Sequence, residues 1–349
     1  MKVSTNDAVR SDPFVKKTGR SWRALLVIVI GLCVLVISMA LSLTQGVVQM
    51  PLSAAWDALV HFTPGSMQHL IIQDLRLPRV LASALVGAAL AVAGAVMQGI
   101  TQNPMADSGL MGLNAGASFM LSLCFAFVPG LSYSYIILYS FFGASISAGL
   151  VYGISSLQRG GATPMRLVLA GIAVSALLAA IGHGIAIYFG VAQDIAFWTA
   201  GGVAGTTWQQ LRILFPCIAV TLFAAILLSR SISLLSLGEE IAQGLGLRVN
   251  IVKLAAALVV LVLAGASVSV VGPVGLVGLI IPHIARYLVG VDYSWIIPSS
   301  AVLGSLLLVL ADLGARTLNP LHETPIGAII ALIGVPFFLY LARKQRREA

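Results

Sequence analysis

The chain has 349 residues, of which 59% are hydrophobic and only 9% are charged, and its formal net charge is +8 at pH 7. A soluble protein of this length could not cover so apolar a surface with water-compatible groups, so the composition excludes that class and predicts a polytopic membrane protein. The basic excess is explained by membrane topology and anionic lipid, and it does not indicate a nucleic-acid partner.

Apolar runs long enough to cross about 30 Å of hydrocarbon as α-helices recur along the whole chain. We predict an all-α fold with about ten transmembrane helices, of which the third and eighth are short and rich in glycine. The predicted spans are 24–43, 80–99, 113–128, 134–157, 167–190, 210–229, 253–271, 274–289, 295–313 and 325–342. The run LASALV at 81–86 resembles LAAALV at 254–259, in a span of opposite direction. This likeness indicates two inverted five-helix halves.

Basic residues are distributed unevenly between the two sides of this topology. An even number of spans puts both termini on one side, and 16 of the 20 Lys and Arg residues fall there. By the positive-inside bias this side is cytoplasmic. The chain then divides into cytoplasmic basic tails at 1–23 and 343–349 and a transmembrane domain at 24–342, with a long cytoplasmic loop at 231–252. The outward-facing basic residues are Arg76, Arg79, Arg212 and Arg316.

Side chains that carry chemistry are sparse and scattered. The phosphate-binding pattern G-x-x-x-x-G-K-[ST] is absent, so any ATP hydrolysis must take place in another subunit. The five histidines, including His183 in the fifth span, show no metal-ligand spacing, and surface or capping roles are expected for them. Acidic residues lie in loops or near helix ends, with Asp107 in a cytoplasmic turn and Asp312 near the outer end of a span. We therefore expect no catalytic site, metal site or cofactor.

Five blocks of sequence, in order, resemble a known family. They are RLPRVL at 76–81, GAALAVAGAVMQ at 87–98, NPMADSGLMG at 103–112, GPVGLVGLIIPHIAR at 272–286 and ETPIG at 323–327. These blocks look like the permease subunit of type II ABC importers for iron-siderophores, haem and cobalamin, and the likeness spans nearly the whole chain after the N-terminal tail. Met105 and Ser108 stand where that family commonly has leucine and proline.

The resemblance implies a complex of two permease chains, identical or paralogous, with two cytoplasmic ATP-binding subunits and an external solute-binding protein. In this family an Arg-x-x-Arg pair and a third arginine before the last span receive carboxylates of the binding protein. The matching positions here are Arg76, Arg79 and Arg316. Arginine suits this role because its planar fork binds a carboxylate through two hydrogen bonds and keeps its charge. The alternative is that these side chains reach lipid phosphates.

The cytoplasmic loop 231–252 contains a predicted short helix, with acidic residues at its start and glycines at its end. Leu237, Ile241 and Leu245 form an apolar stripe with no membrane to face, which favours a protein partner over a solvated connector. The segment resembles the coupling helices that this family inserts into its ATPase. The residues assigned to this contact are Gly238, Glu239, Glu240, Ile241, Gly244, Leu245 and Gly246.

The resemblance also places a cytoplasmic gate in the turn before the fifth span, at Thr163, Pro164 and Met165. It implies that spans three, five, eight and ten line the pathway between two permease copies. The groups available there are Ser, Thr, Asn114, Met and small residues, which would not hold a large cargo tightly. Affinity for the cargo is therefore expected to lie in the binding protein.

The sequence predicts a multi-pass permease of the cell membrane that brings a ferric siderophore into the cytoplasm, driven by ATP hydrolysis in a partner subunit. The same importer class carrying haem, cobalamin or an oxyanion is the nearest alternative. An ion-coupled secondary transporter is a second alternative. It is disfavoured because no ionisable residue is expected near the membrane midplane, although backbone carbonyls can bind sodium. No paired acid and base supports an intramembrane enzyme.

Overall fold

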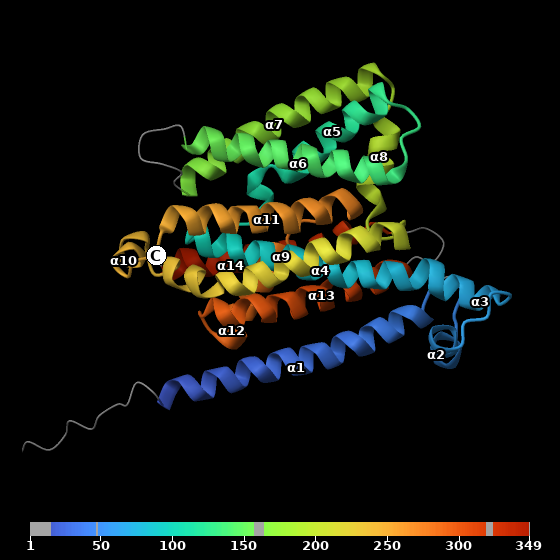
Figure 1. Cartoon of the computed structure of the whole chain (residues 1–349), viewed down its shortest axis with the longest axis horizontal. Helices are drawn as coiled ribbons and strands as arrows, with labels where there is room; N and C mark the ends of the chain where they lie inside the picture. The colour runs from blue at the N-terminus through green and yellow to red at the C-terminus, as the bar shows by residue number, and fades with distance from the viewer. Residues whose placement is uncertain (1–14, 47, 157–163, 319–323, 349) are drawn as a thin grey trace, which may run out of the picture.

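The computed structural model describes residues 15–46, 48–156, 164–318 and 324–348, and every regular element in these ranges is helical (Figure 1). Seven of the described helices are long and apolar enough to cross a membrane, and three shorter apolar helices bring the number to ten. The ten are α1 Val15–Thr44, α4 Leu77–Thr101, α5 Leu113–Phe127, α6 Tyr133–Ser156, α7 Pro164–Tyr188, α9 Trp208–Leu235, α11 Val249–Val271, α12 Val277–Val289, α13 Tyr293–Leu318 and α14 Ile326–Glu348. The predicted all-α fold and number of spans are confirmed.

Short helical elements flank or connect these ten. They are α2 Leu52–Val60, α3 Met67–Leu70, the π-helix η1 Ile71–Arg76, the 3-10 helix η2 Ser108–Met111, α8 Ala192–Gly201 and α10 Glu239–Gly244. Helices α2 and α3 lie at one end of the bundle, called the α2 end below, and α10 lies at the opposite end, called the α10 end (Figure 1). The two ends therefore present different short elements to whatever lies beyond the membrane.

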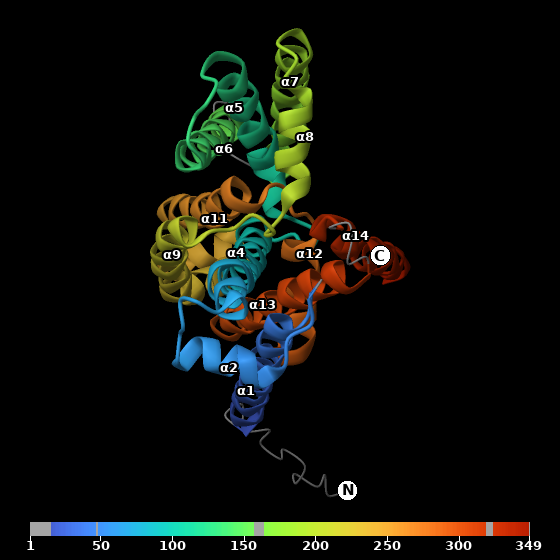
Figure 2. The same ribbon diagram turned by 90° about the vertical axis from the view of Figure 1, so that its right-hand side faces the viewer.

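Helix α4 forms the centre of the bundle, surrounded by α9, α11, α12 and α13 (Figure 2). Small residues along α4 let these neighbours approach closely, and close packing replaces the hydrophobic driving force that is missing between helices in lipid. A Cβ atom on Gly87 would lie 2.2 Å from the carbonyl oxygen of Gly304 on α13, and one on Gly94 would lie 1.9 Å from that of Gly278 on α12. Both crossings therefore require glycine.

Helices α5, α6, α7 and α8 form a second group beside α11 (Figure 1). Helix α5 crosses α6 at a pair of glycines, since a Cβ atom on Gly116 would lie 2.3 Å from the carbonyl oxygen of Gly143. The hydroxyl of Ser147 on α6 donates a hydrogen bond of 2.8 Å to the carbonyl oxygen of Gly112, which has φ 68°. Glycine suits this left-handed conformation because it has no Cβ atom. The start of α5 is thereby anchored to α6.

The two short helices α5 and α12 begin inside the bundle. A Cβ atom on Gly112, just before α5, would meet the hydroxyls of Ser147 and Ser175, which lie well within α6 and α7. The loop before α5 therefore turns back between the helices. Asp107 follows this path, because its Oδ1 lies 2.6 Å from the position of a Cβ atom on Gly278 at the start of α12. The sequence predicted a cytoplasmic turn at Asp107 but not its contact with α12, since local sequence does not reveal that a loop packs back into the bundle.

The connection that contains α10 is shorter than predicted. Helix α9 continues to Leu235 and α11 begins at Val249, so the link covers 236–248 instead of 231–252. The α-helices extend past the apolar runs because a helix can continue with polar residues beyond the hydrocarbon. Only the short helix and its flanking residues remain for contact with a partner.

The elements at the α2 end have a hydrophobic cluster of their own. Its buried members are Leu43, Met50, Ala55, Ala58, Ile72 and Val80. Hydrogen bonds add to this packing: Trp208 Nε1 on α9 donates to the carbonyl oxygen of Gln73 at 2.8 Å, and Gln73 Nε2 donates to that of Ala58 at 2.9 Å. These contacts hold η1 in place, and η1 ends at Arg76.

Candidate functional site

Arg76, Arg79 and Arg316 come together at the α2 end of the bundle. Arg76 is the last residue of η1, Arg79 lies in the first turn of α4, and Arg316 lies in the last turn of α13. Because α4 and α13 pack along each other, the start of one helix lies beside the end of the other. The tertiary structure thus unites the three positions that the sequence assigned to docking.

The side chain of Asp312 links two of these arginines. Its Oδ1 accepts a hydrogen bond of 2.8 Å from Nε of Arg79, and its Oδ2 lies 2.8 Å from Nη2 of Arg316, one turn further along α13. The Asp312 side chain is fully buried, and both arginine side chains are nearly so. Arg316 also donates to the hydroxyl of Ser42 and, at 3.4 Å, to the carbonyl oxygen of Gln45. This network joins α1, α4 and α13.

Arg76 is held by backbone carbonyl groups. Its Nη1 donates to the carbonyl oxygen of Leu43 at 2.6 Å, and its Nη2 donates to that of Val48 at 2.5 Å. Leu43 lies in the last turn of α1, where carbonyl groups that lack a helical partner carry partial negative charge and attract a cation. A Cβ atom on Gly46 would lie 3.0 Å from Arg76 Nη2, so glycine leaves the space that this side chain needs.

The three arginines are directed into the protein. Arg76, Arg79 and Arg316 are 7%, 8% and 9% exposed. The alternative in which they contact lipid phosphates is therefore wrong. Asp312, which lies 233 residues after Arg79, supplies a buried acceptor for Arg79 and Arg316, and backbone carbonyl groups supply the acceptors for Arg76. Docking of external carboxylates remains a prediction, and such carboxylates must reach groups that already have partners.

Replacing Arg76 by alanine is expected to destabilise the chain by about 3 kcal/mol or more, because Arg76 donates two hydrogen bonds and bonds to a charged group contribute roughly 1.5–3 kcal/mol each. The midpoint of thermal unfolding in detergent measures the change. Arg212→Ala, at an exposed position on α9, is the control and is expected to stay within about 0.5 kcal/mol of the parent. Equal midpoints for the two variants would mean that the contacts of Arg76 contribute nothing to stability.

The predicted short helix at the α10 end is present as α10. Gly238, with φ 125°, precedes it and Gly246, with φ 84°, follows it. The helix begins at Glu239 and ends at Gly244, as its acidic start and glycine end indicated. Glu239 forms an ion pair with Lys253 at the start of α11, and Ala242 is fully buried. The apolar stripe faces away from the bundle, since its three members are 61%, 54% and 64% exposed. They are Leu237, Ile241 and Leu245. The contact with an ATPase remains a prediction.

The proposed gate is only partly described. Thr163 lies outside the described residues. Pro164 is the first residue of α7, where a missing N–H is tolerated, and the side chain of Met165 is 69% exposed. The exposed methionine is compatible with a position at the mouth of a pathway, and its role as a gate remains a prediction.

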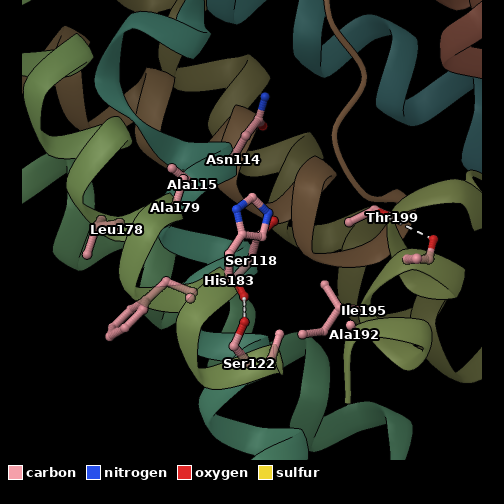
Figure 3. A pocket seen from close by; sticks show the side chains of 14 residues that line it. Asn114, Ala115, Ser118, Ser122, Leu178, Ala179, His183, Ala192, Ile195 and Thr199 are labelled. Atoms are coloured by element: carbon pink, nitrogen blue, oxygen red, sulfur yellow. Dashed lines mark hydrogen bonds between the residues drawn. The ribbon is translucent and has the colours of Figure 1, made fainter. Parts of the chain in front are cut away.

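A cavity of about 370 Å³ lies between α5, α7 and α8 (Figure 3). His183 on α7 points into it, and Asn114, Ser118 and Thr199 line it with apolar residues. None of the described residues around it is a carboxylate, a lysine or an arginine. Sequence reasoning assigned His183 only a surface or capping role. The glycines on either side of it could have indicated that space is left around the imidazole.

The described ranges contain no group of three or more His, Cys, Asp or Glu side chains that could hold a metal ion. Asp57 lies near two histidines, His61 at 3.4 Å and His69 at 3.5 Å, in the short elements of the α2 end. His69 Nδ1 also accepts a hydrogen bond from the backbone N–H of Thr63 at 3.1 Å. These contacts connect α2 to α3 and are sufficient to explain the positions of the two imidazoles.

Comparison with known proteins identifies relatives along almost the whole chain. Residues 34–344 match the model of the FecCD transport family. The iron(3+)-hydroxamate import system permease protein FhuB of Bacillus subtilis (strain 168) is 51% identical over 333 residues, covering 95% of this chain and 87% of the relative. The ferric enterobactin transport system permease protein FepD of Escherichia coli (strain K12) is 38% identical over 318 residues, covering 90% of this chain and 94% of the relative.

A solved structure has the same arrangement of helices. It is described as an inward-facing conformation of a metal-chelate type ABC transporter. It aligns with a TM-score of 0.80 and 28% sequence identity, covering 92% of this chain and 99% of that chain. The family match, the relatives and the solved structure each cover most of the chain. The chain belongs to the FecCD transport family.

Proposed function

We propose that the chain is the membrane-spanning subunit of a binding-protein-dependent ABC importer, and that its cargo is a ferric siderophore of the hydroxamate class. The proposal rests on the 51% identity, over 95% of this chain, to a permease named for iron(3+)-hydroxamate import. The cavity beside α7 supports it, because none of its described lining residues is a carboxylate, a lysine or an arginine. Three hydroxamates neutralise Fe³⁺, whereas three catecholates leave a strongly anionic complex, so an uncharged lining fits the hydroxamate chelate better.

The chain would act with a second permease chain, identical or paralogous, two cytoplasmic ATP-binding subunits and an extracytoplasmic solute-binding protein. The lack of a phosphate-binding lysine motif supports a separate ATPase. The exposed apolar stripe on α10 supports a protein partner at that end, because three large apolar side chains in a row are unfavourable in water. No nucleic-acid partner is proposed.

The two ends of the bundle would face opposite sides of the cell membrane. Both termini and α10 would be cytoplasmic, in keeping with the basic residues that gather on that side. The α2 end would face outward and receive the binding protein at Arg76, Arg79 and Arg316. Three guanidinium groups within one small region favour carboxylates as the docking groups. Residues 163–165 would form the cytoplasmic gate.

Reconstitution of the complete importer in proteoliposomes tests the function. With the binding protein supplied outside and ATP inside, we expect uptake of a ferric trihydroxamate to exceed uptake of a ferric tricatecholate and of haem. Omission of ATP or of the binding protein should abolish uptake. Equal uptake without ATP would favour an ion-coupled carrier, and preferred uptake of haem or the catecholate would contradict the hydroxamate assignment.

The purified chain by itself is expected to bind neither ATP nor the chelate tightly. The chain has no phosphate-binding loop that could hold ATP. A cargo held tightly inside the membrane would not be released during each transport cycle. Equilibrium dialysis of the detergent-solubilised chain against labelled nucleotide and ferric trihydroxamate measures both affinities. Saturable submicromolar binding of the chelate without the binding protein would indicate a specificity site within the permease itself.

A further inference from the structure

The guanidinium of Arg316 has hydrogen-bond partners within the chain for some of its nitrogens but not for all of them. Its Nη2 lies beside Asp312 Oδ2 and contacts Ser42, and its Nη1 makes one long hydrogen bond of 3.4 Å to Gln45. Its Nε is buried and has no hydrogen-bond partner among the described residues. An unpaired donor on a buried charged group is unfavourable. Arg316 is therefore ready to bind a further acceptor.

The geometry of the fork identifies what kind of acceptor would fit. The Nε–H and one N–H of Nη2 lie along the same edge of a guanidinium, and a carboxylate that approaches this edge accepts both hydrogen bonds. Asp312 reaches only the Nη2 side of it, because its other oxygen accepts from Arg79 Nε. A carboxylate that binds Arg316 through the whole edge must compete with Asp312 for Nη2.

The neighbouring charges make such an exchange favourable. Arg76 and Arg79 lie close enough to Arg316 to repel its charge. Arg79 and Arg316 both contact the carboxylate of Asp312, which is fully buried. An additional carboxylate entering from the α2 end would reduce this repulsion and satisfy the free Nε of Arg316.

We infer that Asp312 is a positioning residue for docking. It holds Arg79 and Arg316 in place while no binding protein is present, and a carboxylate of the docked protein replaces it as the partner of Arg316. The inference rests on the proposed docking function of the arginines. Because the same contacts join α4 to α13, docking would also loosen the link between these helices at the α2 end.

Asp312→Asn in the full importer, reconstituted in lipid nanodiscs, tests this inference. The variant by itself is expected to unfold at a lower temperature, because two buried guanidiniums lose their carboxylate. Its affinity for the binding protein is expected to rise by about tenfold, since the docking carboxylate no longer competes with Asp312. Saturating binding protein should therefore raise the unfolding temperature of the variant by more than it raises that of the parent.

Two variants serve as controls. Asp312→Glu keeps the charge and should retain an affinity close to that of the parent. Asp74→Asn removes an exposed carboxylate from η1 without touching the ion pairs, and its affinity should change by less than about twofold. If Asp312→Asn weakens docking together with stability, Asp312 is a structural contact only and the inference is overturned. If Asp74→Asn tightens docking equally, the effect is general electrostatics, which also overturns it.

Arg316→Gln separates this inference from the docking proposal. If Arg316→Gln leaves docking unchanged, the docking site itself is wrong. If it weakens docking but Asp312→Asn does not tighten it, only the exchange is wrong. If Asp312→Asn fails to assemble, Arg79→Gln is compared with the double variant Arg79→Gln/Asp312→Asn. The double variant loses one positive and one negative charge beside Arg316, so the net charge there equals that of the parent. Tighter docking of the double variant supports the exchange, and equal or weaker docking overturns it.

Discussion

Gly94→Ala is expected to disrupt the packing of α4 against α12 and to prevent the chain from forming a stable monodisperse protein. The new Cβ atom would lie 1.9 Å from the carbonyl oxygen and 2.3 Å from the Cα atom of Gly278. Both obstacles are backbone atoms, so no side-chain rotation relieves the clash and the two helices must separate. Overpacking in a well-packed core costs about 1–3 kcal/mol, and a backbone clash in the central helix belongs at the upper end or above it.

Size-exclusion elution in detergent and the midpoint of thermal unfolding measure this effect. Gly149→Ala on α6 is the matched control, because a Cβ atom there would meet nothing within 4 Å. Alanine at an open helical position is expected to be neutral or stabilising by up to about 1 kcal/mol. If Gly94→Ala and Gly149→Ala behaved alike, close approach of α4 and α12 would not be required for folding.

Ile241→Asp is expected to lower ATP-driven uptake by more than about thirtyfold while leaving stability nearly unchanged. Ile241 is the central member of the α10 stripe and is 54% exposed, so its replacement breaks few contacts within the chain. A large apolar residue at the centre of a protein interface commonly contributes about 2 kcal/mol or more, and a buried aspartate there would add a desolvation cost. The complex with the ATPase should therefore fail to couple hydrolysis to transport.

Uptake, cargo-stimulated ATP hydrolysis and co-purification of the ATPase are the three measurements for this variant. Gln243→Ala, exposed on the same helix but outside the stripe, is the control and should retain uptake. Ala242→Pro also abolishes coupling in our expectation, but it acts differently. Ala242 is fully buried and its N–H donates to the carbonyl oxygen of Gly238 at 3.0 Å, so proline breaks the helix itself. Normal uptake by Ile241→Asp would make α10 a mere connector.

The positions of the candidate docking residues could be predicted from the sequence, but their burial could not. The motif at 76–79 and the arginine at 316 could be assigned from their resemblance to a family, and the structure brings them together. Their burial could not be predicted, because an arginine near the end of an apolar run has the same local sequence whether it bonds to lipid, to a partner or to its own chain. The decisive partner, Asp312, lies on a different helix from Arg79, 233 residues away.

The α10 segment could be predicted from local sequence, whereas the cavity beside α7 could not. The helix could be predicted because its acidic start, its glycines and its apolar stripe are neighbours in the chain. The position of His183 could not, because it depends on how α5, α7 and α8 pack together. In a helix whose faces are nearly all apolar, hydrophobic periodicity does not say which face meets a neighbouring helix and which meets lipid.

The sequence by itself determined the all-α class, the ten spans and the predicted direction of insertion, because run length and the positions of basic residues are properties of contiguous segments. Only the tertiary structure decided that α5 and α12 begin inside the bundle, that Gly94 meets Gly278, and that Asp312 pairs with Arg79 and Arg316. These features arise from contacts between distant segments. Close packing in lipid depends on the fit of whole helix surfaces, and this fit is absent from any single stretch of sequence.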